Sequence, residues 1–349
     1  MRQTGRPQHR LDPTRSSLIA LALLVAVLVA VRIVPSRAAD APLPVAIAYQ
    51  ADLGWLQFGA RALGLFEKAG LAPKYVKFLA GAPMIAAAQG GSIDVAAPGI
   101  VPFITGVGQG VDWVAVGIDA AGASSEGFMT RKDAGVNTIA DLKGKKIGYF
   151  RASTAHYALV TILRKHQIGL NEVQLLPMAP AQQFAALSNK DIDAAEVWEP
   201  WMQKMIHQAN GKILVTEKDE GIYTAAAVLA VRREWLATHR ETVRRFLSAL
   251  VLAQDALDKD RSPALKVVSQ EMGIPGEWAL VSYNADPPEI RKWLDPAYPY
   301  SIGPDGLLRK NLDDVARFLF EEKVITKPVD THNLIDTSIL EEVLKASRK

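Results

Sequence analysis

Short apolar runs alternate with amphipathic stretches and turn residues along most of the chain, a pattern typical of α/β proteins. The apolar run Val45–Tyr49 predicts a buried strand, and the helical spacing over Leu56–Ala69 predicts a helix that ends at Gly70. The next predicted elements are strands at Tyr75–Leu79, Asp94–Ala97 and Trp113–Gly117, and a helix at Pro83–Gln89. Together these elements predict a first doubly wound lobe.

The same alternation starts again between Asn137 and Trp201. It predicts strands at Lys146–Phe150, Val173–Pro177 and Ala194–Trp198, and helices at Ala155–His166 and Ala181–Ser188. The apolar segment Thr224–Val231 resembles a strand that returns the chain to the first lobe. Crossings near Met129 and near Val228 then form a hinge. We therefore expect an α/β protein with residues 39–130 and 228–349 in lobe 1 and residues 131–227 in lobe 2.

The amino-terminal segment has the pattern of a secretory signal. Four arginines precede an unbroken apolar run of 14 residues, Leu18–Val31, and Arg32 ends the run. A helix needs roughly 20 apolar residues to cross a bilayer, so the run is short for a membrane span. Ser36 and Ala38 supply small residues before a cleavage site. We expect residues 1–38 to be a signal peptide, with an uncleaved anchor as the alternative.

Cleavage changes the charge of the protein. The full chain carries 40 basic and 37 acidic residues, whereas the chain without residues 1–38 carries 34 and 36, a net charge of −2. No Lys/Arg cluster of the kind that binds nucleic acid remains, so we exclude a nucleic-acid partner. The chain has no cysteine, which excludes disulfides, thiolate metal sites, cysteine nucleophiles and a lipid-modified amino-terminal cysteine. In a Gram-negative cell these features predict a freely diffusing periplasmic protein.

Several motifs together resemble taurine and aliphatic sulfonate binding proteins. They are VAIAYQ at Val45–Gln50, FLAGAPMIAAAQGGSIDVAAPGIVPF at Phe78–Phe103, DLKGKKIGYF at Asp141–Phe150, STAHYAL at Ser153–Leu159, DIDAAEVWEPW at Asp191–Trp201 and KPVDTHNLID at Lys327–Asp336. The resemblance covers essentially the whole mature chain. It implies a two-lobed, type II-like periplasmic binding protein that captures a small organic anion between its lobes for a nitrate, sulfonate or taurine ABC importer. The implied partners are that anion and the importer's membrane subunits, and we expect a monomer without a cofactor.

Ser153 and Thr154 are the first candidate site residues. They stand where a predicted strand ends and a predicted helix opens, so unpaired backbone N–H groups and two hydroxyls converge on one point. This arrangement favours an anion, and His156 in the first turn could donate a further hydrogen bond. The alternative is that Ser153 or Thr154 only caps the helix.

Further candidates occupy the loops around the predicted crevice. Trp198 could cover the body of a ligand, and Glu199 could accept hydrogen bonds from an amine or hydroxyl. The alternative is a core tryptophan beside a solvated glutamate. The other candidates, in the first lobe, are Trp55, Gly81, Ala82 and Gly99. Glycine there would let a ligand approach backbone N–H groups, although ordinary turns use the same residues.

Two departures from the resembled pattern bear on the ligand. Ile100 and Val101 stand where many relatives carry small hydroxyl residues, and Thr224–Ala227 offers alanines where taurine binders can carry an acid for the ligand amine. We therefore expect a hydrophobic organic anion, such as an alkyl or aryl sulfonate or a carboxylate, in preference to taurine.

The main rivals are an enzyme and a receptor for an uncharged ligand. The chain also distantly resembles pyrimidine synthases of thiamine biosynthesis, but these rely on a cysteine-rich motif. The six histidines lack metal-ligand spacing, and neither a G-x-S-x-G elbow nor a P-loop is present. We therefore expect no catalytic residue and no metal. A periplasmic receptor for a pyrimidine thiamine precursor, stacked on Trp198 and bonded to Glu199, remains the alternative.

Overall fold

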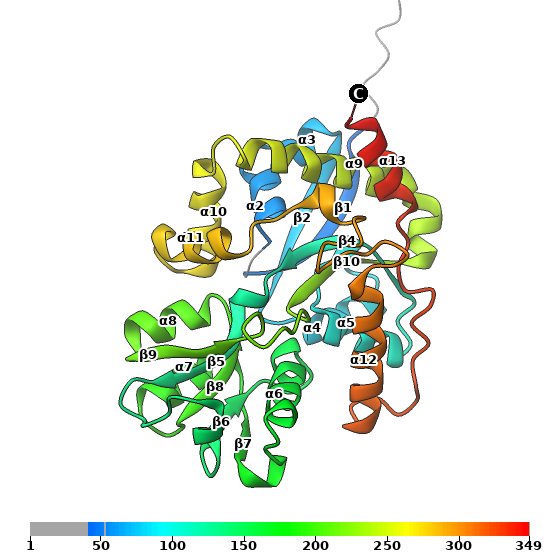
Figure 1. The fold of residues 1–349 in the computed structure, drawn as a ribbon. Coiled ribbons are helices and arrows are strands. Elements are labelled where there is room, and N and C mark those ends of the chain that lie inside the picture. Colours follow the sequence, from blue (N-terminus) through cyan, green and yellow to red (C-terminus); the bar gives the residue numbers. More distant parts are fainter. Residues whose placement is uncertain (1–40, 52–53, 349) are drawn as a thin grey trace, which may run out of the picture. The chain divides into compact units, whose positions relative to one another are not determined.

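Two mixed five-stranded sheets form the framework of the computed structural model, which describes residues 41–51 and 54–348 (Figure 1). The predicted signal peptide, residues 1–38, lies outside the described residues. No helix among the described residues is long and apolar enough to cross a membrane.

The first sheet has the strand order β2-β1-β3-β10-β4. Its strands are β1 (Leu43–Gln50), β2 (Leu71–Phe78), β3 (Val95–Ala96), β4 (Trp113–Ala121) and β10 (Ala226–Arg232). Strands β1, β2 and β3 run parallel, and β10 is antiparallel to β3 and β4. The central strands are almost wholly apolar because helices cover both faces of such a sheet.

Four helices lie between the strands of this sheet along the chain: α2 (Trp55–Ala62), α3 (Leu65–Lys68), α4 (Ala82–Gln89) and α5 (Ile100–Gly108). The single helix predicted over Leu56–Ala69 is wrong. Gly64 adopts a left-handed φ of 61°, which ends α2 and separates it from α3. Helix α5 was not predicted.

The second sheet has the order β7-β6-β8-β5-β9. Its strands are β5 (Glu126–Arg131), β6 (Lys146–Tyr149), β7 (Gln174–Pro177), β8 (Ala194–Trp198) and β9 (Gly211–Thr216). Strand β6 runs parallel to β7 and β8, whereas β5 is antiparallel to β8 and β9. Three helices accompany the sheet: α6 (Thr154–Lys165), α7 (Pro180–Ser188) and α8 (Trp201–Gln208).

The chain crosses between the sheets earlier than predicted. It leaves the first sheet after Ala121 and enters the second at Glu126, so Met129 lies inside β5 and not at a crossing. The return strand β10 begins at Ala226. A lobe boundary at residue 130 therefore falls within a strand of the second sheet. The division into two separate lobes stays a prediction, because Pro42–Lys349 forms one compact unit.

The carboxyl-terminal part is helical, as predicted. Its helices are α9 (Arg233–Leu257), α10 (Ser262–Met272), α11 (Gly276–Ala285), α12 (Leu307–Glu321) and α13 (Ser338–Ala346). Helix α9 packs against α2 and α13, and α12 packs against α5. One buried apolar cluster contains side chains from both sheets, including Ile47 and Ile147, and a smaller cluster lies around α7 and α8. The two sheets are thus held in one hydrophobic core.

Candidate functional site

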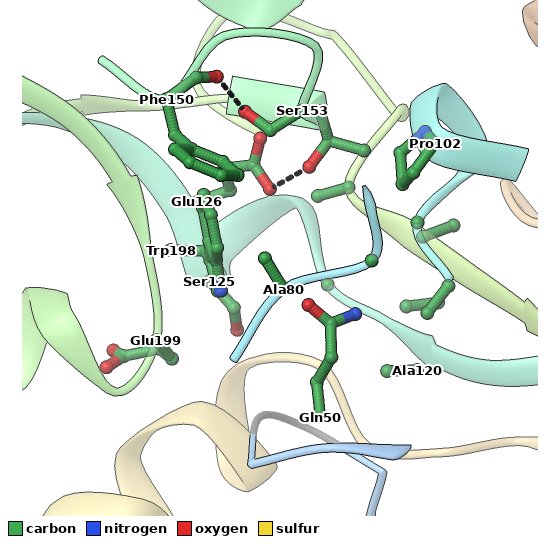
Figure 2. Close-up of a pocket in the computed structure, with 18 of the residues that line it drawn as sticks. Gln50, Ala80, Pro102, Ala120, Ser125, Glu126, Phe150, Ser153, Trp198 and Glu199 are labelled. Atoms are coloured by element: carbon green, nitrogen blue, oxygen red, sulfur yellow. Dashed lines mark hydrogen bonds between the residues drawn. The ribbon is translucent and has the colours of Figure 1, made fainter. Parts of the chain in front are cut away.

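A pocket of about 610 Å³, counted to its open mouth, lies where strand ends from both sheets meet (Figure 2). Gln50 ends β1, Trp198 ends β8, and the segments that follow β2, β3 and β6 also reach the pocket. The carboxyl ends of strands are where α/β proteins bind ligands. The lining residues are Gln50, Ala80, Gly81, Ala82, Gly99, Pro102, Ala120, Ala121, Gly122, Ser125, Glu126, Phe150, Ala152, Ser153, Thr154, Trp198, Glu199, Ala225, Ala226 and Ala227.

Three helices begin at this pocket. Helix α4 begins at Ala82, α5 follows Gly99, and α6 begins at Thr154. The first amides of a helix have no acceptor within the helix and carry the positive end of its dipole. An anionic group can therefore bind here by backbone N–H groups alone. No lysine, arginine or histidine is among the lining residues that the structure describes.

The two predicted glycines allow chain segments to pack closely. A Cβ on Gly81 would lie 2.6 Å from Cγ of Pro102, and one on Gly99 would lie 3.2 Å from Cγ2 of Thr154. Gly99 belongs to the first sheet's side of the pocket and Thr154 to the second. Glycine at these positions therefore brings the two walls together, in addition to leaving backbone open to a ligand.

The hydroxyls of Ser153 and Thr154 are engaged by protein groups. Oγ of Ser153 accepts the N–H of His156 at 3.2 Å and donates to the carbonyl of Phe150 at 2.6 Å. Oγ1 of Thr154 donates to Oε2 of Glu126 at 2.8 Å, and Figure 2 shows both donated bonds. The capping alternative is thus confirmed for Ser153. Both residues still line the pocket, and the backbone amides of Thr154 and Ala155 have no acceptor within the helix.

His156 does not line the pocket, which corrects the prediction that it donates to the ligand. Its ring stacks on Tyr149 with centroids 4.8 Å apart and meets the edge of Phe318 at 5.2 Å. Burial, with a smaller effect of the Arg151 charge, lowers the pKa of His156 to about 4. The imidazole is therefore neutral at neutral pH and acts as an aromatic core side chain.

Replacement of this histidine tests that assignment. His156→Ala is expected to lower the free energy of unfolding by about 2 kcal/mol, because a buried ring with two aromatic neighbours is lost. Ligand affinity should change less than about threefold, a difference below 1 kcal/mol. Urea unfolding and calorimetric titration measure the two quantities, with the exposed His332→Ala as control. A large loss of affinity at unchanged stability would return His156 to the site.

Trp198 and Glu199 differ in how they face the pocket. The half-buried indole of Trp198 lies beside Phe150, with ring centroids 6.3 Å apart, and the pair forms an aromatic wall. The carboxylate of Glu199 points away from the pocket in Figure 2 and accepts both Nε2 and the backbone N–H of Gln203, at 2.9 and 3.2 Å. Burial raises the pKa of Glu199 to about 7. Of the two, only Trp198 presents its side chain to the pocket.

Trp55 is a core residue, which corrects its prediction as a ligand contact. Its side chain is 1% exposed and meets the ring of Tyr283 edge-on at 4.8 Å. It faces a separate, smaller cavity that also contacts Trp293, outside the main pocket. Its place in the sequence, at the start of the helix that follows β1, fits a core residue as well as a pocket residue.

Three polar lining residues were missed in the sequence. Glu126 opens β5 and is 3% exposed, Ser125 before it has a buried hydroxyl without a hydrogen-bond partner, and Gln50 donates from Nε2 to the carbonyl of Ala97 at 3.2 Å. The only available signal was a polar residue at the end of an apolar strand, which applies to Gln50. The Ser125 hydroxyl, in the pocket wall, is therefore a hydrogen-bond donor without a partner among the described residues.

A family model described as "NMT1/THI5 like" matches residues 57–259, more than half of the chain. A putative aliphatic sulfonates-binding protein of Bacillus subtilis is 25% identical over 84% of this chain and 83% of its own length. The taurine-binding periplasmic protein of Escherichia coli is 26% identical over 60% of this chain and 65% of its own. These distant relatives confirm the resemblance carried by the motifs.

Solved structures show the same fold. The periplasmic aliphatic sulphonate binding protein SsuA of Escherichia coli gives a TM-score of 0.72 at 22% identity, over 86% of this chain and 99% of its own. The nitrate-binding protein NrtA of Synechocystis gives 0.69 at 14%, over 87% and 88%. The desulfurization enzyme DszB gives 0.66 at 17%, over 88% and 100%. The predicted fold class, α/β of the type II periplasmic binding protein kind, is confirmed.

Proposed function

Because this chain belongs to the NMT1/THI5-like family of substrate-binding proteins, we propose that it captures a small organic anion in the pocket and delivers it to an ABC importer from the periplasm. It is a solute-binding protein of the sulfonate, taurine and nitrate transporter family. The observation that carries the anionic part is the convergence of three helix starts on the pocket.

The remaining walls favour an apolar body on this anion. Trp198 and Phe150 form one wall, and Ala225, Ala226 and Ala227 form another. Contact with these side chains removes apolar surface from water, which stabilises the complex by roughly 25 cal/mol per Å². An alkyl or aryl sulfonate, or a carboxylate with a hydrophobic body, fits both halves of the pocket. Glu126 also lies in the wall, so an amine-bearing sulfonate such as taurine is a second ligand to compare.

A pyrimidine ligand receives less support. That alternative needs the carboxylate of Glu199 to meet the ring, but this carboxylate engages Gln203 and points away from the pocket. Because DszB, which shares this fold, is an enzyme, turnover of a bound ligand is tested directly. We propose binding without reaction, so a ligand recovered after incubation should have an unchanged mass, and a converted product would contradict this part of the proposal.

Calorimetric titration with ligands of one body and different charge tests the proposal. Hexanesulfonate, hexanol and hexylamine share an alkyl chain, and only the first carries the negative charge that the helix starts favour. Helix ends stabilise such a charge by about 0.3–2 kcal/mol each, so we expect hexanesulfonate to bind at least tenfold more tightly than the other two. It should also bind more tightly than taurine, because the aromatic wall offers the sulfonate chain more apolar contact.

Equal or tighter binding of hexylamine would overturn the anionic assignment. Tighter binding of taurine than of hexanesulfonate would overturn the hydrophobic body and assign Glu126 to the ligand amine. Absence of measurable binding across hexanesulfonate, benzenesulfonate, hexanoate and taurine would overturn the proposed function itself.

A further inference from the structure

Three buried glutamates lie at the pocket, one in its wall and two behind it. Glu126 lines the pocket, Glu196 lies on the neighbouring strand β8, and Glu217 follows β9; their exposed fractions are 3%, 0% and 0%. The β5–β8 register pairs Glu126 with Trp198 and Phe128 with Glu196. Residues two apart on a strand share a face, so Glu126 and Glu196 are diagonal neighbours on one face of the sheet.

The cluster also joins the two chain crossings. The N–H of Glu217 donates to the carbonyl of Glu126 at 3.0 Å, and Glu126 opens the segment after the first crossing. The Glu217 carboxylate accepts bonds from the N–H groups of Thr224 and Ala225 at 3.0 and 2.8 Å, and from Oγ1 of Thr224 at 2.9 Å. Ala225 lines the pocket on the second crossing. Hydrogen bonds thus connect Glu217 to two residues of the pocket wall, Glu126 and Ala225.

The groups around the cluster offer it little positive charge. Helix α6 contributes the hydroxyl of Thr154 and the phenol of Tyr157. The segment that precedes α12 contributes the phenol of Tyr300. Neither Glu196 nor Glu217 has a cationic partner among the described residues, and both oxygens of Glu196 lack any hydrogen-bond partner. The nearby Lys218 instead pairs with Asp286. A buried carboxyl without compensation is held in its neutral form.

The direction of the pKa shifts agrees with this geometry. Burial, together with the charges of Glu126 and Glu217, raises the pKa of Glu196 well above its ordinary value. Burial raises the pKa of Glu217 to about 7, despite its three hydrogen bonds. Burial also raises the pKa values of Tyr157 and Tyr300, to which the charge of Glu217 contributes. The Glu217 carboxyl therefore changes charge near neutral pH, and the pKa of Glu196 is raised in the same direction.

We propose that the Glu126, Glu196 and Glu217 cluster makes anion capture proton-coupled, so that a bound anion draws a proton onto the cluster and affinity falls as pH rises. This inference rests on the proposed function. Oε2 of Glu126 accepts a bond from Oγ1 of Thr154, the first residue of α6, so an anion held at that helix start lies on the same side of the pocket as this carboxyl group. Each ionised carboxylate in that wall repels the anion. Binding therefore favours the protonated cluster, and linkage requires that protons be taken up when the anion binds.

The test is calorimetry with hexanesulfonate, which stays ionised at every pH used, so that any proton taken up belongs to the protein. Titrations at pH 7.5 in buffers of different ionisation enthalpy measure the number of protons. We expect between about 0.3 and 1 proton per anion, with affinity falling about two- to tenfold per pH unit from pH 7 to 8.5. Binding with no proton uptake and no pH dependence would overturn the inference while leaving the proposed function intact.

Variants assign the proton to the cluster. Glu196→Gln/Glu217→Gln should reduce the uptake at least threefold, whereas Glu277→Gln, an exposed acid in the first turn of α11, should leave it unchanged. Glu199→Gln is the critical comparison, because Glu199 also titrates near pH 7 but faces Gln203. Proton uptake that is unchanged in the double variant, or that is lost in Glu199→Gln, would overturn the assignment. If the double variant fails to fold, the buffer dependence of the wild-type protein together with Glu199→Gln decides. Lack of any hexanesulfonate binding would overturn the inference along with the anionic ligand class.

Discussion

Ala82→Asp should weaken hexanesulfonate binding by about hundredfold or more without destabilising the fold. Ala82 is the first residue of α4, half-buried in the wall of the pocket. A carboxylate there stands close to the expected position of the bound anion, and two like charges about 4 Å apart repel by about 4 kcal/mol at a protein surface. The same carboxylate at a helix start is favourable for the helix itself, so thermal stability should stay level or rise slightly.

The matched control is Ala82→Asn, which has nearly the same shape and no charge. It should lose less than about tenfold in affinity, which separates repulsion from crowding. Equal losses in both variants would mean that the added side chain only blocks the pocket. Retained affinity in Ala82→Asp would place the anion away from the start of α4.

Gly127→Ala should lower the free energy of unfolding by about 3 kcal/mol or more. Gly127 lies in β5, between β8 and β9. A Cβ there would lie 2.3 Å from the carbonyl oxygen of Val215 and 2.7 Å from Cα of Thr216. These are backbone atoms, so no side-chain rotation relieves the clash. Strand β9 would have to shift, and Glu217 with it.

Gly90→Ala is the control for this effect. Gly90 has an ordinary φ of −77°, and its added Cβ would be no closer than 3.5 Å to another atom. Chemical denaturation should find this variant within about 0.5 kcal/mol of the wild-type protein. A Gly127→Ala protein of near wild-type stability would show that β5 and β9 are less closely packed than the described contacts require.

The sequence predicted those elements whose local pattern agrees with their packing. Strand β8 matches its prediction at both ends, Ala194–Trp198, because four of its five residues are apolar and the run is bounded by polar residues. Strand β5 was missed because its sequence contains Thr130 and Arg131, which usually face water. Here Oγ1 of Thr130 donates to the carbonyl of Asp193 at 2.9 Å, and Nη1 of Arg131 to that of Ile192 at 2.6 Å. Partners about 60 residues away satisfy these groups, and no local pattern records them.

The residues of the candidate site were likewise predictable only where the local pattern determines their position. Loop positions after parallel strands identified Gly81, Ala82, Gly99, Ser153 and Thr154, all of which line the pocket. Helical geometry could not show that His156, two residues beyond Thr154, turns away toward Tyr149. Glu126 was missed because the first crossing was predicted near Met129, after this residue, and because it reaches the pocket through antiparallel pairing of β5 with β8. Side-chain direction at strand ends and crossings depends on tertiary packing, which a single sequence does not display.

A crystal structure with hexanesulfonate bound tests the central claim most directly. The account predicts one anion per chain, with sulfonate oxygens within hydrogen-bond distance of first-turn amides of α4 and α6 and the alkyl chain against Trp198 and Phe150. A sulfonate bound outside this pocket, or an alkyl chain at the helix starts with the sulfonate away from them, would contradict it.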